Sequence, residues 1–153
     1  METDKLTIFS KSKMTSFELT DKPTNETINW LISRPWWTSH HHQLQNYLYN
    51  LIHDTHLVAC PGDTLVAKSF LLTGGQIKLI KSQNDIKLKK MEQSQCHINS
   101  LKLFKKGKIN EMHTGYALSQ DGLWRYHSWG LKNNKVIETT EPRIAYFSIM
   151  IIK

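Results

Sequence analysis

A cysteine, a histidine and a carboxylate follow one another in the second half of the chain, in an order that suits an activated thiol. Cys96 opens a stretch with a helical pattern, His127 lies in a predicted strand, and Glu138 lies in the strand after it. A thiolate nucleophile needs a base to take its proton and a group that orients the base. A helix N-terminus adds unpaired N–H groups and a positive dipole end, which stabilise a thiolate. These residues therefore predict a thiol enzyme with Cys96 as its nucleophile.

The turn between the two strands decides whether His127 and Glu138 can meet. If Asn133-Asn134 forms a two-residue turn, the register places Trp129 directly opposite Glu138. His127 shares a face with Trp129, because alternate residues of a strand point to the same side. His127 and Glu138 are then diagonal neighbours with backbones roughly 7–8 Å apart, within reach of a Glu side chain. An odd-length turn would put the two residues on opposite faces.

Two other residues compete with Glu138 for His127. Thr140 lies directly opposite His127 in the same register, and Asp121 lies farther away. We prefer Glu138 because a carboxylate both fixes the imidazole tautomer and stabilises the imidazolium cation.

The pattern of apolar residues predicts the elements of the first half. Residues 1–22 are polar and are expected to form an irregular arm, whereas residues 23–153 are long enough for one domain with its own core. Two helices are expected first, a short one capped by Thr24 or Asn25 and a second one over residues 39–53. Short apolar runs broken by Pro-Gly and Gly-Gly pairs then predict strands, at residues 57–60, 64–67, 70–72 and 76–80.

The second half begins with a polar, basic segment over residues 81–95, predicted to be loop with some helix. The Cys96 helix is expected to bury Ile98, Leu101 and Phe104 and to end near Gly107. Strands then follow closely, at residues 115–119, 123–129, 136–140 and 143–152, with the last one central in the sheet. This order predicts an α+β fold in which the Cys96 helix packs on a C-terminal antiparallel sheet.

The residues around the histidine and the carboxylate also carry a family resemblance. His127-Ser-Trp129, followed by Ile137-Glu138-Thr-Thr-Glu-Pro142, resembles the His-x-Trp and downstream Asp-Pro-Thr strands of transglutaminase-like proteins, within the papain-like cysteine enzymes. The resemblance covers about Cys96 to Pro142, with Glu in place of the usual Asp, and Gly115–Gly130 is also similar to a motif of small bacterial proteins. It implies a papain-like fold and acyl transfer at an amide, isopeptide or ester bond. Cys96 would be the nucleophile, His127 the base and Glu138 the orienting residue.

An acyl-transfer site also needs hydrogen-bond donors for the oxyanion, besides the backbone N–H of Cys96. The side-chain candidates are Gln93, Gln95 and Asn99. The family resemblance favours Gln93, because an upstream Gln plays this part in papain-like enzymes. Trp129 and Tyr116 are candidates for the lining of a substrate cleft.

Nothing in the sequence points to a metal or a cofactor. The triplet His40-His41-His42 stands at a helix start, and adjacent histidines on a helix diverge, so we expect a capping or surface role. The pair Cys96-His97 has no second Cys/His pair at zinc spacing, and no glycine-rich phosphate loop is present. Cys60, which leads into Pro-Gly, is expected to be a small buried apolar residue.

The net charge of +7 raises the question of an anionic partner. Of the 20 basic residues only Arg34, Arg125 and Arg143 are arginines, and the lysines concentrate between Lys78 and Lys108. Bidentate recognition of phosphates and guanines favours Arg, so nucleic acid is disfavoured as the partner. We expect a protein or peptide substrate, and the basic surface favours an acidic one. The alternative is a non-catalytic binding module whose lysine-rich face docks an acidic protein or nucleic acid.

The distribution of apolar residues along the sequence indicates where in the cell the protein is expected. No apolar run approaches the roughly 20 residues that span a bilayer, and the first residues lack the pattern of a signal peptide. We therefore expect a cytoplasmic protein without a membrane segment, with secretion by a route without a cleaved signal left open. The sequence carries no sign of the oligomeric state.

Overall fold

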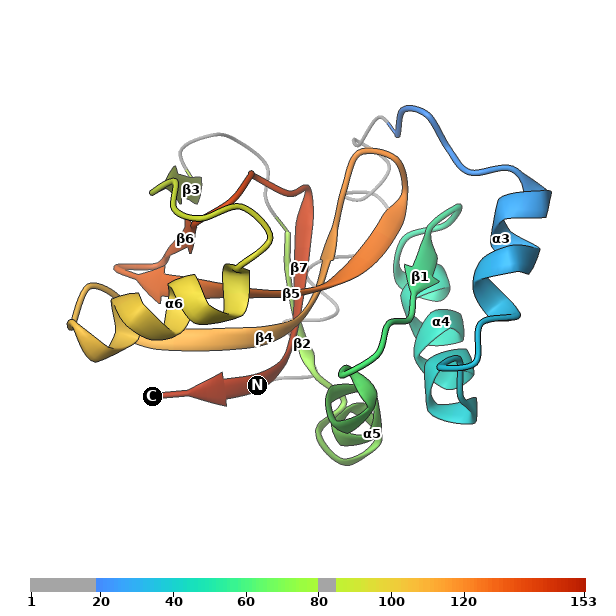
Figure 1. The fold of residues 1–153 in the computed structure, drawn as a ribbon, viewed down its shortest axis with the longest axis horizontal. Coiled ribbons are helices and arrows are strands. Elements are labelled where there is room, and N and C mark those ends of the chain that lie inside the picture. Colours follow the sequence, from blue (N-terminus) through green and yellow to red (C-terminus); the bar gives the residue numbers. More distant parts are fainter. Residues whose placement is uncertain (1–18, 80–84) are drawn as a thin grey trace.

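The computed structural model describes residues 19–79 and 85–153 (Figure 1). Most of the predicted N-terminal arm lies outside these residues. The described part contains four helices: α3 (Asn25–Ile32), α4 (Ser39–Leu51), α5 (Thr64–Thr73) and α6 (Cys96–Lys105). It contains seven strands: β1 (His56–Val58), β2 (Gln76–Leu79), β3 (Ile86–Leu88), β4 (Glu111–Leu118), β5 (Leu123–Lys132), β6 (Lys135–Glu138) and β7 (Ala145–Ile152). Among the described residues, no helix is long and apolar enough to cross a membrane.

All seven strands join one sheet in the order β2-β7-β4-β5-β6-β3, with β1 pairing to β5 outside this path. The pairings β4–β5, β4–β7 and β5–β6 are antiparallel, as predicted, and β7 lies between two other strands. The sheet as a whole is mixed, because β1 runs parallel to β5 and β3 runs parallel to β6. The α+β prediction is therefore confirmed, but the sheet is mixed where a C-terminal antiparallel sheet was predicted.

The helices and one face of the sheet enclose the main core. Apolar side chains of α4 and α5 meet those of β4, β5 and β7, with Leu44, Leu48, Phe70, Tyr116, Trp124 and Phe147 among the buried residues. α6 packs on β5 and β4, and Leu103 forms a second cluster with Ile109, Met112 and Ile137. A third cluster, which includes Trp129, Val136 and Tyr146, contains the strand residues that alternate with those of the first two.

The chain folds as a helix where two strands were predicted at 64–67 and 70–72. α5 buries Val66, Ala67 and Phe70, and this spacing of one, three and four residues is that of one helical face. Gly74 then ends the helix in the left-handed conformation, with φ of 70°, and its N–H bonds to the Phe70 carbonyl. The prediction was wrong because the apolar residues are nearly continuous, so that the exposed Leu71 and Leu72 hid the helical period.

The Cys96 helix forms where it was predicted, but it is rotated about its axis relative to the prediction. Ile98 and Leu101 are exposed, and the buried face carries Asn99, Ser100 and Leu103. Asn99 explains part of this choice, because its side-chain amide donates to the Glu92 carbonyl in the loop before the helix, at 2.8 Å. Cys96 stands three and four residues before Asn99 and Ser100, so this rotation turns the cysteine toward the sheet.

A short strand in the polar segment 81–95 was not predicted from the sequence. β3 pairs in parallel with β6, and the chain beyond it stays attached, with Lys89 N–H donating to Glu138 O and Met91 N–H to Thr139 O, both at 2.8 Å. These two bonds fix the chain that leads into α6 to the backbone carbonyls of Glu138 and Thr139. This attachment helps to set the distance between the Cys96 helix and the carboxylate of Glu138.

Candidate active site

The site lies at a gap in strand pairing along one edge of β5. β1 pairs with this edge up to Arg125, and β6 pairs with it from Gly130 onward. Residues 126–129 of β5 therefore face neither strand on that side, and the N-terminus of α6 occupies this position. The backbone N–H of Ser128, which lies in the gap, donates to the Cys96 sulfur. The gap lets a helix on one face of the sheet bring its first residue to His127, whose side chain belongs to the other face.

The predicted two-residue turn is present and brings His127 and Glu138 together. Asn133 and Asn134 adopt φ values of 50° and 63°, as in the turns that match the twist of a hairpin. Lys132 pairs with Lys135 across it, as the proposed register requires. His127 Nε2 lies 2.9 Å from Oε1 and 3.0 Å from Oε2 of Glu138.

Glu138 is a fully buried carboxylate whose oxygens accept several further hydrogen bonds. The Tyr146 hydroxyl donates to Oε1 at 2.8 Å. Oε2 accepts from the backbone N–H of Thr139 at 3.1 Å and of Thr140 at 3.2 Å, and from the Thr140 hydroxyl at 3.1 Å. Burial alone would raise the pKa of Glu138, but the hydrogen bonds and charge of His127, with those of Tyr146 and Thr140, bring it below its ordinary value. Glu138 is therefore ionised at neutral pH.

The ionised Glu138 determines what His127 can do. Because a carboxylate only accepts, the imidazole must donate from Nε2, and Nδ1 is left for the thiol. Burial favours the neutral ring, but the hydrogen bonds to Cys96 and Glu138 and the Glu138 charge outweigh it and raise the pKa of His127. His127 is thus held as a buried, oriented imidazole that gains stability when it carries a proton.

The pKa of Cys96 is shifted in the opposite direction from that of His127. Burial of the half-buried thiol acts to raise its pKa, but hydrogen bonds with His127 and His97, the charge of His127 and the Ser128 N–H lower it to about 5. Its position as the first residue of α6 adds the favourable field of a helix N-terminus. The lowered pKa of Cys96 and the raised pKa of His127 both favour a thiolate–imidazolium ion pair over the neutral thiol and imidazole.

His97 is a site residue whose sequence position suggested only half of a metal pair with Cys96. Its Nδ1 is hydrogen-bonded to the Ser128 hydroxyl, which in turn bonds the Thr114 hydroxyl at 2.7 Å. The ring also packs against Tyr126, with centroids 4.4 Å apart. These contacts hold a second imidazole beside the Cys96 sulfur. Its place directly after Cys96 was the available signal, but only the rotation of α6 shows that it points to the site.

Tyr146 and Thr140 were not predicted as supports of the carboxylate. Thr140, which competed with Glu138 for His127, instead bonds Glu138 itself. Asp121, the other competitor, forms an ion pair with Arg125 at 2.7 Å. Tyr146 reaches Glu138 because β7 pairs with β4. This pairing joins distant segments, so it cannot be predicted from the local sequence around either strand.

The second cysteine lies in a different environment. Burial and the nearby Asp63 charge raise the pKa of Cys60 to about 11, so its thiol is protonated at neutral pH. Asp63 accepts from Tyr116 Oη at 2.6 Å, from the Cys60 backbone N–H at 3.3 Å and, at 2.9 Å, bonds Nε2 of His41. His41 also completes a capping box with Thr38 at the start of α4, which is one of the roles expected for the histidine triplet. This network anchors α4 to the sheet.

Several predicted site residues lie away from the reacting groups. Gln93 and Gln95 have exposed side chains in and next to the loop before α6. The Asn99 side chain is buried and committed to the Glu92 carbonyl, so it is not available to an oxyanion. Trp129 and Tyr116 are both packed in the core, with 2% and 0% exposure. The prediction that they line an open substrate cleft is therefore wrong.

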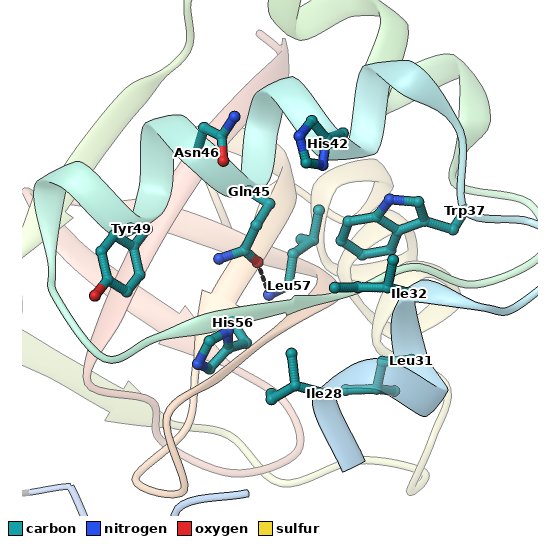
Figure 2. A pocket seen from close by; sticks show the side chains of 10 residues that line it. All are labelled: Ile28, Leu31, Ile32, Trp37, His42, Gln45, Asn46, Tyr49, His56 and Leu57. Carbon is teal, nitrogen blue, oxygen red and sulfur yellow. Dashed lines mark hydrogen bonds between the residues drawn. The ribbon is translucent and has the colours of Figure 1, made fainter. Parts of the chain in front are cut away.

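Two hollows lie outside this site. The first, of about 230 Å³, lies between α3, α4 and β1 (Figure 2), where Gln45 bonds the Leu57 N–H and the Thr55 carbonyl and so ties α4 to β1. Its lining is largely apolar, and it stands at the end of the molecule away from α6 (Figure 1). The second, of about 520 Å³, is lined mainly by lysines, which come from β3, β5 and β6 and from the chain after β3 and after α6.

Comparison of the chain with family models, with curated proteins and with solved structures finds no match. The described residues contain no group of three or more His, Cys, Asp or Glu side chains that could hold a metal ion.

Proposed function

We propose that the protein is a cysteine-dependent hydrolase or acyltransferase acting on an amide, isopeptide or ester bond, with hydrolysis as the default reaction. The observation that carries the proposal is the hydrogen-bonded series from the Cys96 thiol through His127 to the buried Glu138. The resemblance to transglutaminase-like, papain-like enzymes supports the same roles for the same three residues. The α+β arrangement, with the cysteine at the start of a helix packed on a sheet, fits that resemblance.

In the first half-reaction, the Cys96 thiolate would attack the substrate carbonyl carbon and form a C–S bond, while an electron pair moves onto the oxygen. As the carbonyl re-forms, the bond to the leaving nitrogen or oxygen breaks. Nδ1–H of the imidazolium on His127 gives its proton to the departing amine or alcohol. Glu138 stays ionised and holds the ring in place, as expected of an orienting carboxylate.

The second half-reaction would return the enzyme to its starting state. The now neutral His127 takes a proton from water, and the resulting hydroxide adds to the thioester carbon. Collapse of this intermediate breaks the C–S bond, releases a carboxylic acid and regenerates the Cys96 thiolate. An amine in place of water would give transfer instead of hydrolysis, so access to the acyl-enzyme decides between the two outcomes.

The oxyanion requires donors that face the developing charge. The first N–H groups of a helix have no partner within it, so the Cys96 N–H can serve as one donor. For the second, the geometry favours His97 over the glutamines, because its imidazole already bonds the sulfur and the oxyanion forms only two bonds from that sulfur. Ser128 and Tyr126 fix the ring in this position.

Acylation of the protein tests the proposal directly. With a small activated ester, intact-mass analysis should show one acyl group on Cys96 that disappears as the product acid forms. The Cys96→Ala variant should carry none, whereas Cys60→Ala should react like the wild type. A Cys96 that becomes a thiolate but accepts no acyl group from ester, amide or isopeptide donors would contradict acyl transfer.

The pH dependence of turnover should follow the lowered pKa of Cys96 and the raised pKa of His127. Because the pKa of Cys96 is lowered to about 5, the thiolate should be lost only as the pH falls through that value. Because the pKa of His127 is raised, the proton for the leaving group should persist above the ordinary value of about 6.5. We therefore expect kcat/KM to form a plateau from about pH 5 to beyond 6.5. The fall on each side of the plateau reports the titration of Cys96 and His127 together, because the two groups interact. An acid limb near the ordinary thiol pKa of about 8.5 would contradict the ion pair.

A further inference from the structure

The lysine-lined hollow gathers basic side chains from three neighbouring strands and the chain after α6. It has a volume of about 520 Å³, and its lining residues are Lys87, Lys89, Lys108, Lys132, Asn133, Lys135 and Ile137. We define the five lysines among them as the lysine pocket. Parallel pairing places Lys87 beside Ile137, and antiparallel pairing places Lys132 beside Lys135, so these side chains share the sheet face on which α6 lies. The cluster is thus a product of the sheet register and not of a single run of lysines.

Among the ion pairs between described residues, none neutralises the charge of the pocket. Across residues 19–79 and 85–153, none of the ion pairs formed by basic side chains includes a lysine of this pocket. Like charges directly opposite each other on paired strands cost stability, and Lys132 and Lys135 are such a pair. A bound anion would offset this repulsion, which is why the arrangement points to a ligand and not merely to a solvated surface.

We propose that the lysine pocket binds an acidic segment of a protein, rich in Asp and Glu side chains. The lining contains no arginine, the residue that suits bidentate recognition of phosphate. It also contains no aromatic side chain, whereas single-stranded nucleic acid is bound by stacking its bases on such rings. Carboxylates make neither demand, because flexible ammonium groups pair with them as point charges. The lining therefore favours carboxylates over nucleic acid.

The place of the pocket relative to Cys96 adds a functional reason. Cys96 is the first residue of α6, and Lys108 follows the C-terminal end of this helix. The ten-residue helix, about 15 Å long, therefore separates Lys108 from Cys96. The acidic segment would therefore bind apart from the reacting bond. If the proposed acyl transfer at Cys96 is right, on which this step rests, an acidic segment bound here would bring its own protein to the thiolate and act as a substrate-docking site.

Binding to the full-length Cys96→Ala variant tests the pocket without any turnover. We expect a fluorescently labelled Glu-rich peptide to bind, its Gln counterpart to bind at least about tenfold more weakly, and the affinity for the Glu peptide to fall with added salt. Reversal of two pocket lysines, Lys87→Glu with Lys135→Glu, should weaken binding at least about tenfold. A matched reversal outside the pocket, Lys68→Glu with Lys105→Glu, should change it by less than about threefold. Thermal unfolding of both double variants checks that they remain folded.

Two outcomes would overturn the proposal for the lysine pocket. Equal losses in the two double variants would mean that the general positive charge binds the peptide. Tighter binding of a single-stranded oligonucleotide or of inorganic phosphate than of the peptide would assign the pocket to phosphate. Failure of the proposed function would look different: the peptide would still bind to the pocket, while Cys96 of the wild type would not be acylated by a small ester.

Discussion

Cys96 is expected to react with iodoacetamide about a hundredfold faster than Cys60 at pH 6.5, in one experiment on the folded wild-type protein. With pKa values of about 5 and about 11, nearly all of Cys96 but only about one part in 10⁴–10⁵ of Cys60 is thiolate at this pH. A thiolate of low pKa is intrinsically less nucleophilic, which removes between two and three of these orders of magnitude. Peptide mass spectrometry of the alkylated protein measures both rates together, so Cys60 is the internal control.

The dependence of the rate on pH is a sharper test than the ratio. Between about pH 6 and 8 the rate at Cys96 should be nearly constant, because the thiolate is already formed. In His127→Gln, which keeps a donor for Glu138, the rate should rise about tenfold per pH unit, as for an ordinary thiol. A wild-type Cys96 that shows this ordinary slope would remove the ion pair on which the catalytic proposal depends.

The relation between His127 and Glu138 could be predicted from the sequence because it depends on parity. A turn of two residues fixes which strand residues share a face, and the Asn133-Asn134 pair, which accepts positive φ, signals such a turn. Cys96 at a helix start was likewise a local feature, set by the helical pattern that begins there. These two local signals suffice to name the three residues.

The features that were not predicted depend on contacts between distant segments. Tyr146 reaches Glu138 only because β7 pairs with β4, and β3 is a short strand of mostly exposed residues that forms only by pairing with β6. The rotation of α6 follows from Asn99 and Leu103 facing the sheet, whereas the helix itself offered Ile98, Leu101 and Phe104 as an equally good apolar stripe. Propensity and periodicity describe one element at a time, so they do not determine which helix face is buried.

These long-range contacts explain why the carboxylate is held so firmly. Glu138 lies at the end of β6, between the chain that precedes α6 and the third apolar cluster. Its oxygens meet donors from β5, from β7 and from the two residues that follow it. A single residue therefore links His127, the last strand and the loop that leads to Cys96.

Glu138→Ala is expected to lower the free energy of unfolding by about 3–5 kcal/mol, the usual cost of removing one partner from a buried charged pair. His127, Tyr146 and Thr140 would each lose an acceptor inside the protein. Tyr146→Phe is the matched control, because it removes one donor and leaves the carboxylate with its other partners. We expect it to cost about 1 kcal/mol. Denaturant unfolding at neutral pH measures both variants, and equal losses would mean that Glu138 has no special place in the site.

The pH dependence of this difference separates the charge of Glu138 from its packing. The folded-state pKa of Glu138 is lowered, so the ionised carboxylate contributes stability above its unfolded pKa of about 4.3 and loses it as the pH falls through the folded value. Glu138→Gln keeps the shape but not the charge. The gap in unfolding free energy between the wild type and Glu138→Gln should therefore narrow below about pH 4 and reach its full size at higher pH. A gap that stays constant from about pH 3 to pH 7 would mean that shape alone, and not the ionised carboxylate, holds His127 in position.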